Sequence, residues 1–177
     1  MKNNKLVEIQ FRKLTLKDID NKYFEWFNNS AVNKYTSHRN YVYTKEMAID
    51  YYNNILKKKK IIHFIIQDIK NNKPIGICSL QSLNNKFKSA ELARFIGDKN
   101  YLNLGLGKKI TEYLVNYAFT KTNFTLLWVG NNINNIGAIK SNKKNGFKDM
   151  HINLISKLVD KIDKNSVYLC KFKDEKI

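Results

Sequence analysis

The feature that most constrains the fold of this chain is a pair of glycines, one residue apart, where a polar loop turns into a segment with helical apolar spacing. Gly105 and Gly107 follow the polar stretch that begins at Asn100, and a strand-like run, Ser89–Ile96, lies upstream. The apolar residues that repeat at helical spacing are Leu106, Ile110, Tyr113, Leu114 and Tyr117. Glycines at such a junction let the backbone approach a ligand, and the first N–H groups of the helix face it at the positive end of the dipole. The pattern predicts a strand, a loop and a helix that bind an anion such as a phosphate or diphosphate.

Three phosphate-binding motifs compete for this stretch, and their spacing separates them. A dinucleotide fingerprint needs a third glycine at Ile110, and a P-loop needs Ser or Thr at Lys109 and a glycine at Leu102. The pattern that remains runs from Leu102 to Gly107, and it resembles the pyrophosphate loop of the GNAT superfamily of acetyl-CoA-dependent N-acetyltransferases, usually Gln/Arg-x-x-Gly-x-Gly/Ala. Leu102 departs from the usual Gln or Arg, and a plain loop before a helix is the alternative interpretation.

Length and composition favour one domain, residues 1–177, with a sizeable core. The chain has one proline, no apolar run near the length of a membrane span, and no apolar segment after Met1 that would indicate a secretory signal. We therefore expect a cytoplasmic protein with no membrane partner. Cys78 and Cys170 lie in apolar, strand-like runs without metal-ligand spacing, which indicates reduced core thiols and no metal site.

The formal net charge of +17 would by itself suggest a nucleic-acid partner. Lysine and asparagine are abundant throughout, however, and Arg12, Arg39 and Arg94 are the only arginines. The one dense basic run, Lys57–Lys60, falls at the end of an expected helix, where the dipole favours cations. Nucleic acid is thus a disfavoured partner, while the positive field still attracts ligands that carry phosphates, including coenzyme A.

The order of expected elements along the chain is β-α-α-β-β-β-α-β-α-β-β. The expected strands are Glu8–Leu14, Ile61–Ile69, Pro74–Leu83, Ser89–Ile96, Thr125–Val129, Phe147–Ser156 and Val167–Phe172. The expected helices run from a Thr15 cap to Phe27, from a Thr44 cap through Lys45–Leu56, from the glycine pair to Phe119, and over Asn135–Asn145, where Gly146 stops the last one. This order is similar to the GNAT fold, an α+β fold. The resemblance implies a mixed, mostly antiparallel sheet of six to seven strands with splayed central strands, flanked by about four helices.

Two further segments strengthen the resemblance. Asn135–Ile139, followed by Lys144–Phe147, looks like the family's Asn-x-x-Ala/Ser-Ile helix that ends in Lys-x-Gly-Phe. Phe24–Val32 and Ile96–Tyr101 look like the branch that includes ribosomal-protein alanine acetyltransferases and amino-sugar acetyltransferases. Together the segments cover nearly the whole chain.

The resemblance implies a reaction in which an amine takes an acetyl group from acetyl-CoA, and it assigns roles to particular residues. Glu91 matches the acidic position that serves as general base, and by period-two alternation it shares a face with Ala93 and Phe95; an exposed strand carboxylate is the alternative. The residues that match cofactor-binding positions are Phe95, Ile96, Gly97, Leu102, Asn103, Leu104, Gly105, Leu106, Gly107, Lys108, Asn135 and Asn142. Asn135 could equally cap the following helix. Asn142 stands where many relatives have a tyrosine that protonates the leaving thiolate, so the proton donor stays unassigned.

Substrate selection is expected from the first two helices and their loop. The substrate-binding candidates there are Trp26, Tyr35, His38 and Arg39. The acceptor that we expect is a small-molecule amine, with a nucleotide-linked amino sugar as the first candidate, and a protein N-terminus is the alternative within the enzyme class. A non-catalytic module that binds acyl-CoA or nucleic acid is the alternative from another class. A homodimer is compatible with the sequence, which does not specify an oligomeric state.

Overall fold

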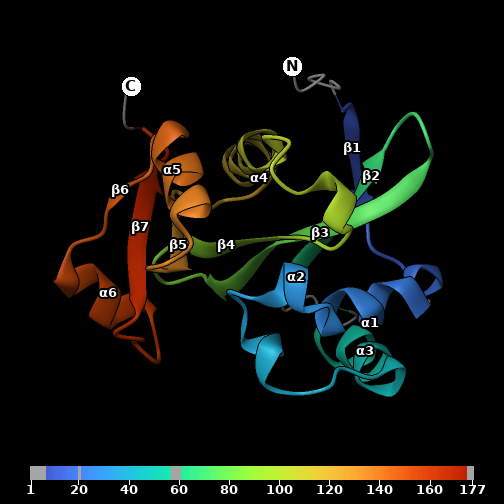
Figure 1. The fold of residues 1–177 in the computed structure, drawn as a ribbon. Helices are drawn as coiled ribbons and strands as arrows, with labels where there is room; N and C mark the ends of the chain where they lie inside the picture. Colours follow the sequence, from blue (N-terminus) through green and yellow to red (C-terminus); the bar gives the residue numbers. More distant parts are fainter. Residues whose placement is uncertain (1–6, 20, 57–60, 175–177) are drawn as a thin grey trace. The chain divides into compact units, whose positions relative to one another are not determined.

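The fold combines strands with helices of unequal length (Figure 1), and the computed structural model describes residues 7–19, 21–56 and 61–174. The strands are β1 (Ile9–Lys13), β2 (Ile62–Asp68), β3 (Lys73–Asn84), β4 (Ser89–Ile96), β5 (Leu126–Asn132), β6 (Lys148–Asp149) and β7 (Ser166–Phe172). The α-helices are α1 (Asn21–Asn28), α2 (Ser30–Asn33), α3 (Lys45–Tyr51), α4 (Leu106–Lys121), α5 (Ile136–Lys144) and α6 (Ile152–Leu158). Shorter helical turns are η1 (Leu16–Asp18), η2 (Ser37–Asn40), the π-helical η3 (Tyr52–Leu56) and η4 (Lys99–Tyr101).

The strands form one seven-stranded sheet in the order β1-β2-β3-β4-β5-β7-β6. β1 runs antiparallel to β2, and β7 runs antiparallel to both β5 and β6. β4 and β5 are parallel, and their register covers three positions, from Ser89 opposite Leu126 to Glu91 opposite Trp128. Both strands continue past this register, β4 to Ile96 and β5 to Asn132. The expected α+β fold with a mixed, mostly antiparallel sheet is confirmed, and the described residues hold six α-helices in place of about four.

The chain packs as two compact units. The N-terminal unit comprises Met1–Ser79 and Arg94–Leu106, and the C-terminal unit comprises Leu80–Ala93 and Gly107–Ile177. β3 and β4 therefore each contribute residues to both units. Cys78 and Cys170 are buried free thiols, as expected from the sequence.

The N-terminal unit has an aromatic core under α1 and α3. Its buried members are Leu14, Ile19, Tyr23, Phe27, Tyr43, Ala48, Ile65 and Ile77. Phe27 stacks on Phe95 of β4 with 5.0 Å between ring centroids and 4° between planes. The Thr44 hydroxyl accepts a hydrogen bond from the Met47 N–H at 3.3 Å, so the predicted cap of α3 is confirmed. The basic run Lys57–Lys60 lies outside the described residues.

The helix expected from Thr15 to Phe27 was wrong in its first turn. Thr15 caps only the short η1, and α1 begins separately at Asn21. The reason lies in Asp18, whose carboxylate accepts hydrogen bonds from the Thr15 N–H at 2.8 Å and from Arg12 Nη1 at 2.8 Å. These local bonds hold a single tight turn in place of a continuing helix.

The strand expected over Phe147–Ser156 was also wrong, because only Lys148 and Asp149 form a strand there. β6 ends at Asp149, and His151 then caps α6 by accepting a hydrogen bond at Nδ1 from the Asn153 N–H at 3.3 Å. The apolar cluster that α6 joins comprises Leu126, Trp128, Met150, Leu158 and Cys170, with Leu154 and Ile155 at its margin. Apolar residues at helical spacing therefore form the core of the C-terminal unit at this position.

Among the described residues, none of the helices combines the length and the apolar character that a membrane crossing requires.

His63 is a titratable side chain sealed inside the N-terminal unit. It is 8% exposed on β2, and its Nδ1 lies 3.4 Å from the Tyr51 hydroxyl. Its Nε2 is buried and has no hydrogen-bond partner among the described residues. Burial disfavours the charged imidazolium and lowers the pKa of His63 from 6.5 to about 4.

This burial predicts a specific acid sensitivity. Because the folded-state pKa of His63 lies below its unfolded value, the unfolded chain takes up the proton first as the pH falls. The free energy of unfolding should therefore decrease by about 3 kcal/mol between about pH 6.5 and pH 4. Urea unfolding at several pH values checks this, with His63→Met as the comparison. The variant should lose most of the pH slope; equal slopes in both proteins would contradict the account.

Candidate active site

Glu91 is a half-buried carboxylate in the middle of β4, within the C-terminal unit. The Ser82 hydroxyl donates a hydrogen bond to Glu91 Oε2 at 2.9 Å. Burial raises the pKa of Glu91 above its usual value, and hydrogen bonds from the Ser82 and Gln81 side chains oppose this in part. A carboxylate with a raised pKa is a stronger base than an exposed one, which suits it to accept a proton from a substrate.

Glu91 lines a pocket of about 320 Å³ that belongs to the C-terminal unit alone. The lining residues are Ser82, Glu91, Trp128, Gly130, Leu158, Val159, Asp160, Lys161, Ser166 and Tyr168. They come from β3, β4, β5, β7, the last residue of α6 and the segment that follows it. The sequence identified only Glu91 among them, because the other residues meet through strand register and through a helix that the sequence did not predict.

The backbone after Glu91 carries three of the residues that were matched to the cofactor. Phe95 stacks on Phe27, and the Gly97 N–H donates to the Ile75 carbonyl oxygen at 2.9 Å. Because that N–H is already used, it does not provide a donor for a ligand. Gly97 has room for no side chain, since a Cβ there would overlap the ring of Trp26. The N-terminal unit thus brings two predicted site residues, Trp26 and Gly97, into contact.

The loop before α4 has the backbone of an anion-binding turn. Asn103 and Gly105 have positive φ values of 61° and 75°, while Leu104 between them does not. Neighbouring left-handed and right-handed residues turn successive N–H groups toward one side and form a concavity for anions, and Asn103 and Gly105 supply the left-handed members of such a pattern. All three residues are exposed, and no atom lies within 4 Å of a Cβ built on Gly105.

The start of α4 adds two elements to this turn. Leu106 and Ile110 are buried and hold the helix in place, so the N–H groups of its first turn stay at the loop. Lys108 is exposed and forms an ion pair with Glu112 at 3.4 Å. Free amides, a positive helix end and a lysine fit a diphosphate, the group that acetyl-CoA would bring to this position.

The asparagines of α5 have structural partners of their own. Asn135 Oδ1 accepts a hydrogen bond from the Ala138 N–H at 3.3 Å and caps α5, as the alternative interpretation expected. Asn142 is fully buried, and its Nδ2 donates to Asn131 Oδ1 at 3.2 Å. Asn131 Nδ2 and the Ser141 hydroxyl are buried polar groups without a hydrogen-bond partner in the described part of the chain. An amide-bearing ligand arm would satisfy such groups.

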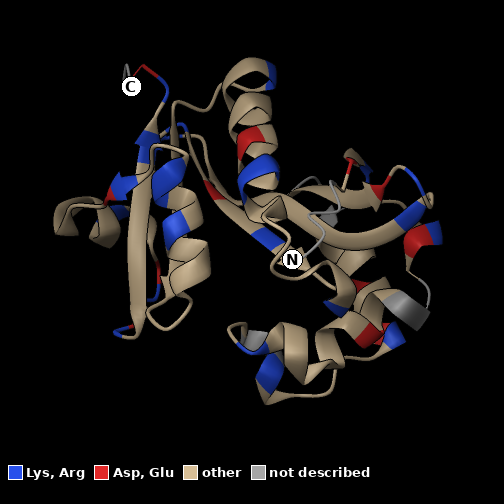
Figure 2. Ribbon diagram, turned by 45° about the horizontal axis from the view of Figure 1, so that its top comes forward, with Lys and Arg blue, Asp and Glu red and all other residues tan. Residues whose placement is uncertain are grey.

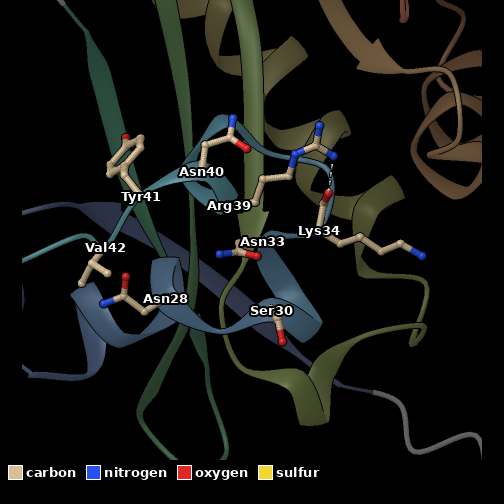
Figure 3. A pocket seen from close by; sticks show the side chains of 8 residues that line it. All are labelled: Asn28, Ser30, Asn33, Lys34, Arg39, Asn40, Tyr41 and Val42. Atoms are coloured by element: carbon tan, nitrogen blue, oxygen red, sulfur yellow. Dashed lines mark hydrogen bonds between the residues drawn. The ribbon is translucent and has the colours of Figure 1, made fainter.

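A second pocket, of about 740 Å³, lies within the N-terminal unit (Figure 3). Its lining residues are Asn28, Ser30, Asn33, Lys34, Arg39, Asn40, Tyr41 and Val42. Arg39 is held by a hydrogen bond from Nη1 to the Lys34 carbonyl oxygen at 3.2 Å. Of the predicted substrate residues, Arg39 lines this pocket and Tyr35 lies next to the Lys34 ammonium, 5.1 Å from ring centroid to Nζ. The side chain of His38 lies outside the described residues.

Lysine and arginine residues are spread over helices and strands of both units (Figure 2). Within the described residues, no group of three or more His, Cys, Asp or Glu side chains is arranged to hold a metal ion.

Comparison with known proteins gives consistent matches. A family model described as acetyltransferase (GNAT) domain matches residues 8–148. A spermidine N-acetyltransferase from Vibrio cholerae, in complex with CoA and spermine, is similar in structure with a TM-score of 0.78 and 18% identity, over 93% of this chain and 95% of that one. A domain from Methanocaldococcus jannaschii has a TM-score of 0.76 and 17% identity, over 94% of this chain and 99% of that one. An aminoglycoside acetyltransferase in complex with coenzyme A and kanamycin has a TM-score of 0.74 and 17% identity, over 94% of this chain and 95% of that one. A search of curated protein sequences gave no match.

The turn before α4 generates a prediction about CoA affinity. Gly105→Ala places a methyl group in open space but at a φ of 75°, which disfavours the left-handed conformation and turns the N–H groups away. The Kd for CoA, measured by isothermal titration calorimetry, should rise about tenfold.

Gly137→Ala is the matched control for this substitution. Gly137 also has no atom within 4 Å of a built Cβ, and its φ is not in the left-handed range. Its variant should bind CoA as the wild type does. Equal affinities in all three proteins would show that the turn does not bind the diphosphate.

Proposed function

We propose that this chain, which belongs to the GNAT family of acetyltransferases, acetylates the primary amine of a small molecule, with a nucleotide-linked amino sugar as the first candidate. The chain is an acetyltransferase that uses acetyl-CoA as its donor. The observation that carries the proposal is Glu91, a carboxylate whose pKa burial raises and which lines a pocket with Ser82 and Trp128.

In the proposed mechanism Glu91 is the general base. The acceptor arrives largely as an ammonium ion, and Glu91 takes one proton from it, directly or through water, to free the nitrogen lone pair. Acetyl-CoA, when bound, would supply the acetyl group as a thioester whose C–S bond breaks as the amine nitrogen bonds to the carbonyl carbon. The second proton that the nitrogen loses on forming the amide passes to the CoA thiolate, directly or through water. The free amides from Asn103 to Lys108 hold its diphosphate.

The leaving thiolate needs no strong acid. An alkyl thiol has an ordinary pKa of about 8.5, so its anion is a workable leaving group near neutral pH. Asn142 stands in the position where many relatives have a tyrosine, and its amide is buried against Asn131. We therefore assign Asn142 a structural role at the cofactor arm rather than proton donation, and Asn135 the role of cap that fixes where α5 begins.

The acceptor is inferred from the pocket of the N-terminal unit. Its lining residues include Lys34 and Arg39, four asparagine and serine side chains with Tyr41, and no carboxylate. Cations and amides of this kind recognise phosphate and hydroxyl groups, and a polycation would be repelled by them and by the net charge of +17. These features favour a sugar with a phosphate or nucleotide attached. Trp26 and Tyr35 are proposed to contribute aromatic surface to the same acceptor, and His38 is a further candidate.

A polyamine or an aminoglycoside is the second candidate. The pocket around Glu91 contains a second carboxylate, Asp160, which would suit a second ammonium group. The similar structures of a spermidine N-acetyltransferase with spermine and of an aminoglycoside acetyltransferase with kanamycin motivate including a polyamine and an aminoglycoside in an assay.

Thiol release measured with a nucleotide-linked amino sugar, spermidine, kanamycin and a peptide N-terminus, each at equal concentration, ranks the candidates. Binding of CoA without thiol release for any of a broad panel of amines would favour a non-catalytic binding module.

Replacing the base should lower turnover without weakening donor binding. Glu91→Gln should reduce kcat by about a hundredfold or more, while the KM for acetyl-CoA changes little. In the wild type, kcat/KM should fall as the pH drops through the raised pKa of Glu91, and this limb should be absent from the residual activity of the variant. Asp149→Asn removes an exposed carboxylate of the same unit and should keep wild-type kinetics. A Glu91→Gln enzyme with wild-type kcat would remove Glu91 as the base.

Removing the cation of the N-terminal pocket tests the acceptor class. Arg39→Ala should raise the KM for a nucleotide-linked amino sugar about tenfold and leave the KM for the same amino sugar without its nucleotide unchanged. Lys45→Ala removes an exposed cation of α3 that does not line the pocket and should have no effect. An unchanged KM for the nucleotide-linked compound in Arg39→Ala would refute the anionic acceptor.

A further inference from the structure

Ser82 of β3 hydrogen-bonds the Glu91 carboxylate. Its Oγ donates to Oε2 at 2.9 Å, and the neighbouring Gln81 side chain favours the charged carboxylate as well. Neighbouring residues of a regular strand point to opposite faces of the sheet. β3 departs from this regular geometry beside the proposed base.

The departure is located at Ser82. Its φ is 48°, in the left-handed region that costs a non-glycine residue free energy. The other described non-glycine residues with positive φ are Asn72, Lys88 and Asn103, which lie in turns or in the loop before α4. Ser82 thus carries this conformation inside a strand, where the sheet would otherwise enforce extended backbone. Strained backbone of this kind persists where surrounding contacts fix it, and it is concentrated at functional sites.

We propose that Ser82 is a positioning residue that fixes the orientation of the Glu91 carboxylate toward the acceptor amine. The proposal rests on the proposed role of Glu91 as the base. With Oε2 bound to Ser82, the carboxylate cannot rotate freely, and it presents a constant lone-pair direction to the pocket. A carboxylate held in one orientation accepts protons faster than one that samples several orientations, because its oxygen is already aligned with the amine when the substrate binds.

The same two donors favour the charged form of Glu91 against its burial. The other ionisable groups that line the pocket are Asp160 and Lys161 after α6 and Tyr168 on β7. Tyr168 accepts a hydrogen bond at its hydroxyl oxygen from the Asp163 N–H at 2.9 Å. This bond, and not one to Glu91, fixes the orientation of the Tyr168 side chain. Loss of a donor at Ser82 or Gln81 should therefore raise the pKa of Glu91 further and move the acid limb of kcat/KM to higher pH.

Ser82→Gly is the decisive variant, because glycine accepts a φ of 48° and the substitution removes the hydroxymethyl group that carries the hydrogen-bond donor. It should lower kcat about tenfold and move the acid limb upward by about one pH unit, with an unchanged KM for acetyl-CoA. Lys88→Gly is the matched control. Lys88 has a φ of 45°, is exposed in the turn between β3 and β4, and uses its backbone for its hydrogen bonds to Asn85, Thr125 and Leu126. It should keep wild-type kcat and pH profile.

A second variant decides the question if Ser82→Gly does not fold. Gln81→Met removes the other donor with little change in volume and should also move the acid limb upward. Loss of activity in Glu91→Gln, with wild-type acid limbs in Ser82→Gly and Gln81→Met, would overturn the positioning role and leave the base in place. Wild-type activity in Glu91→Gln would instead overturn the proposed function itself.

Discussion

The first turn of α4 leaves backbone N–H groups that no carbonyl of the helix can accept, and the proposed function depends on what satisfies them. The loop before the helix exposes these groups instead of covering them, since Asn103, Leu104 and Gly105 are all exposed. The loop is held from its other side by η4. There the Tyr101 hydroxyl donates to Asp68 Oδ2 at 2.6 Å, and Asp98 pairs with Lys73 at 2.6 Å. The turn is therefore anchored at both ends before any ligand arrives, which lowers the entropy cost of binding a diphosphate.

The sequence predicted those parts of the fold that follow from local patterns. The bounds of β4, the Thr44 cap of α3 and the Asn135 cap of α5 all agree with the structure, because alternation, hydroxyl caps and a terminal glycine act within a few residues. The short η1 and the helix α6 were not predicted. The first depends on Arg12, a side chain of the preceding strand, and the second on packing against Trp128 and Met150. Tertiary contacts decide both cases, and single-sequence patterns do not contain them.

The residues of the candidate site likewise fall into those that local patterns predicted and those that only tertiary contacts bring together. Glu91 was predicted from the family resemblance and the glycine loop from motif spacing, but the groups that contact Glu91 were not predicted. Ser82 has no sequence signature for a left-handed conformation, since serine in an alternating run indicates ordinary strand. Asp160 and Tyr168 reach the pocket through strand register and the end of α6, which the sequence misassigned. Of the residues that line the pocket of the N-terminal unit, the sequence predicted only Arg39. Asn28 and Asn33 were not predicted, because their side-chain amides donate to the carbonyl oxygens of Tyr43 and Phe27, and the sequence does not show these bonds.

The central claim is that a diphosphate binds the amides at the start of α4, and amide chemical shifts observe those groups directly. In a ¹⁵N-labelled protein titrated with CoA, the largest changes among the α4 residues should occur at the N–H groups from Leu104 to Lys108, with saturation at a single Kd. Residues at the far end of the helix, around Lys121, should change little. Shifts that leave Leu104–Lys108 unchanged at saturating CoA would contradict the account.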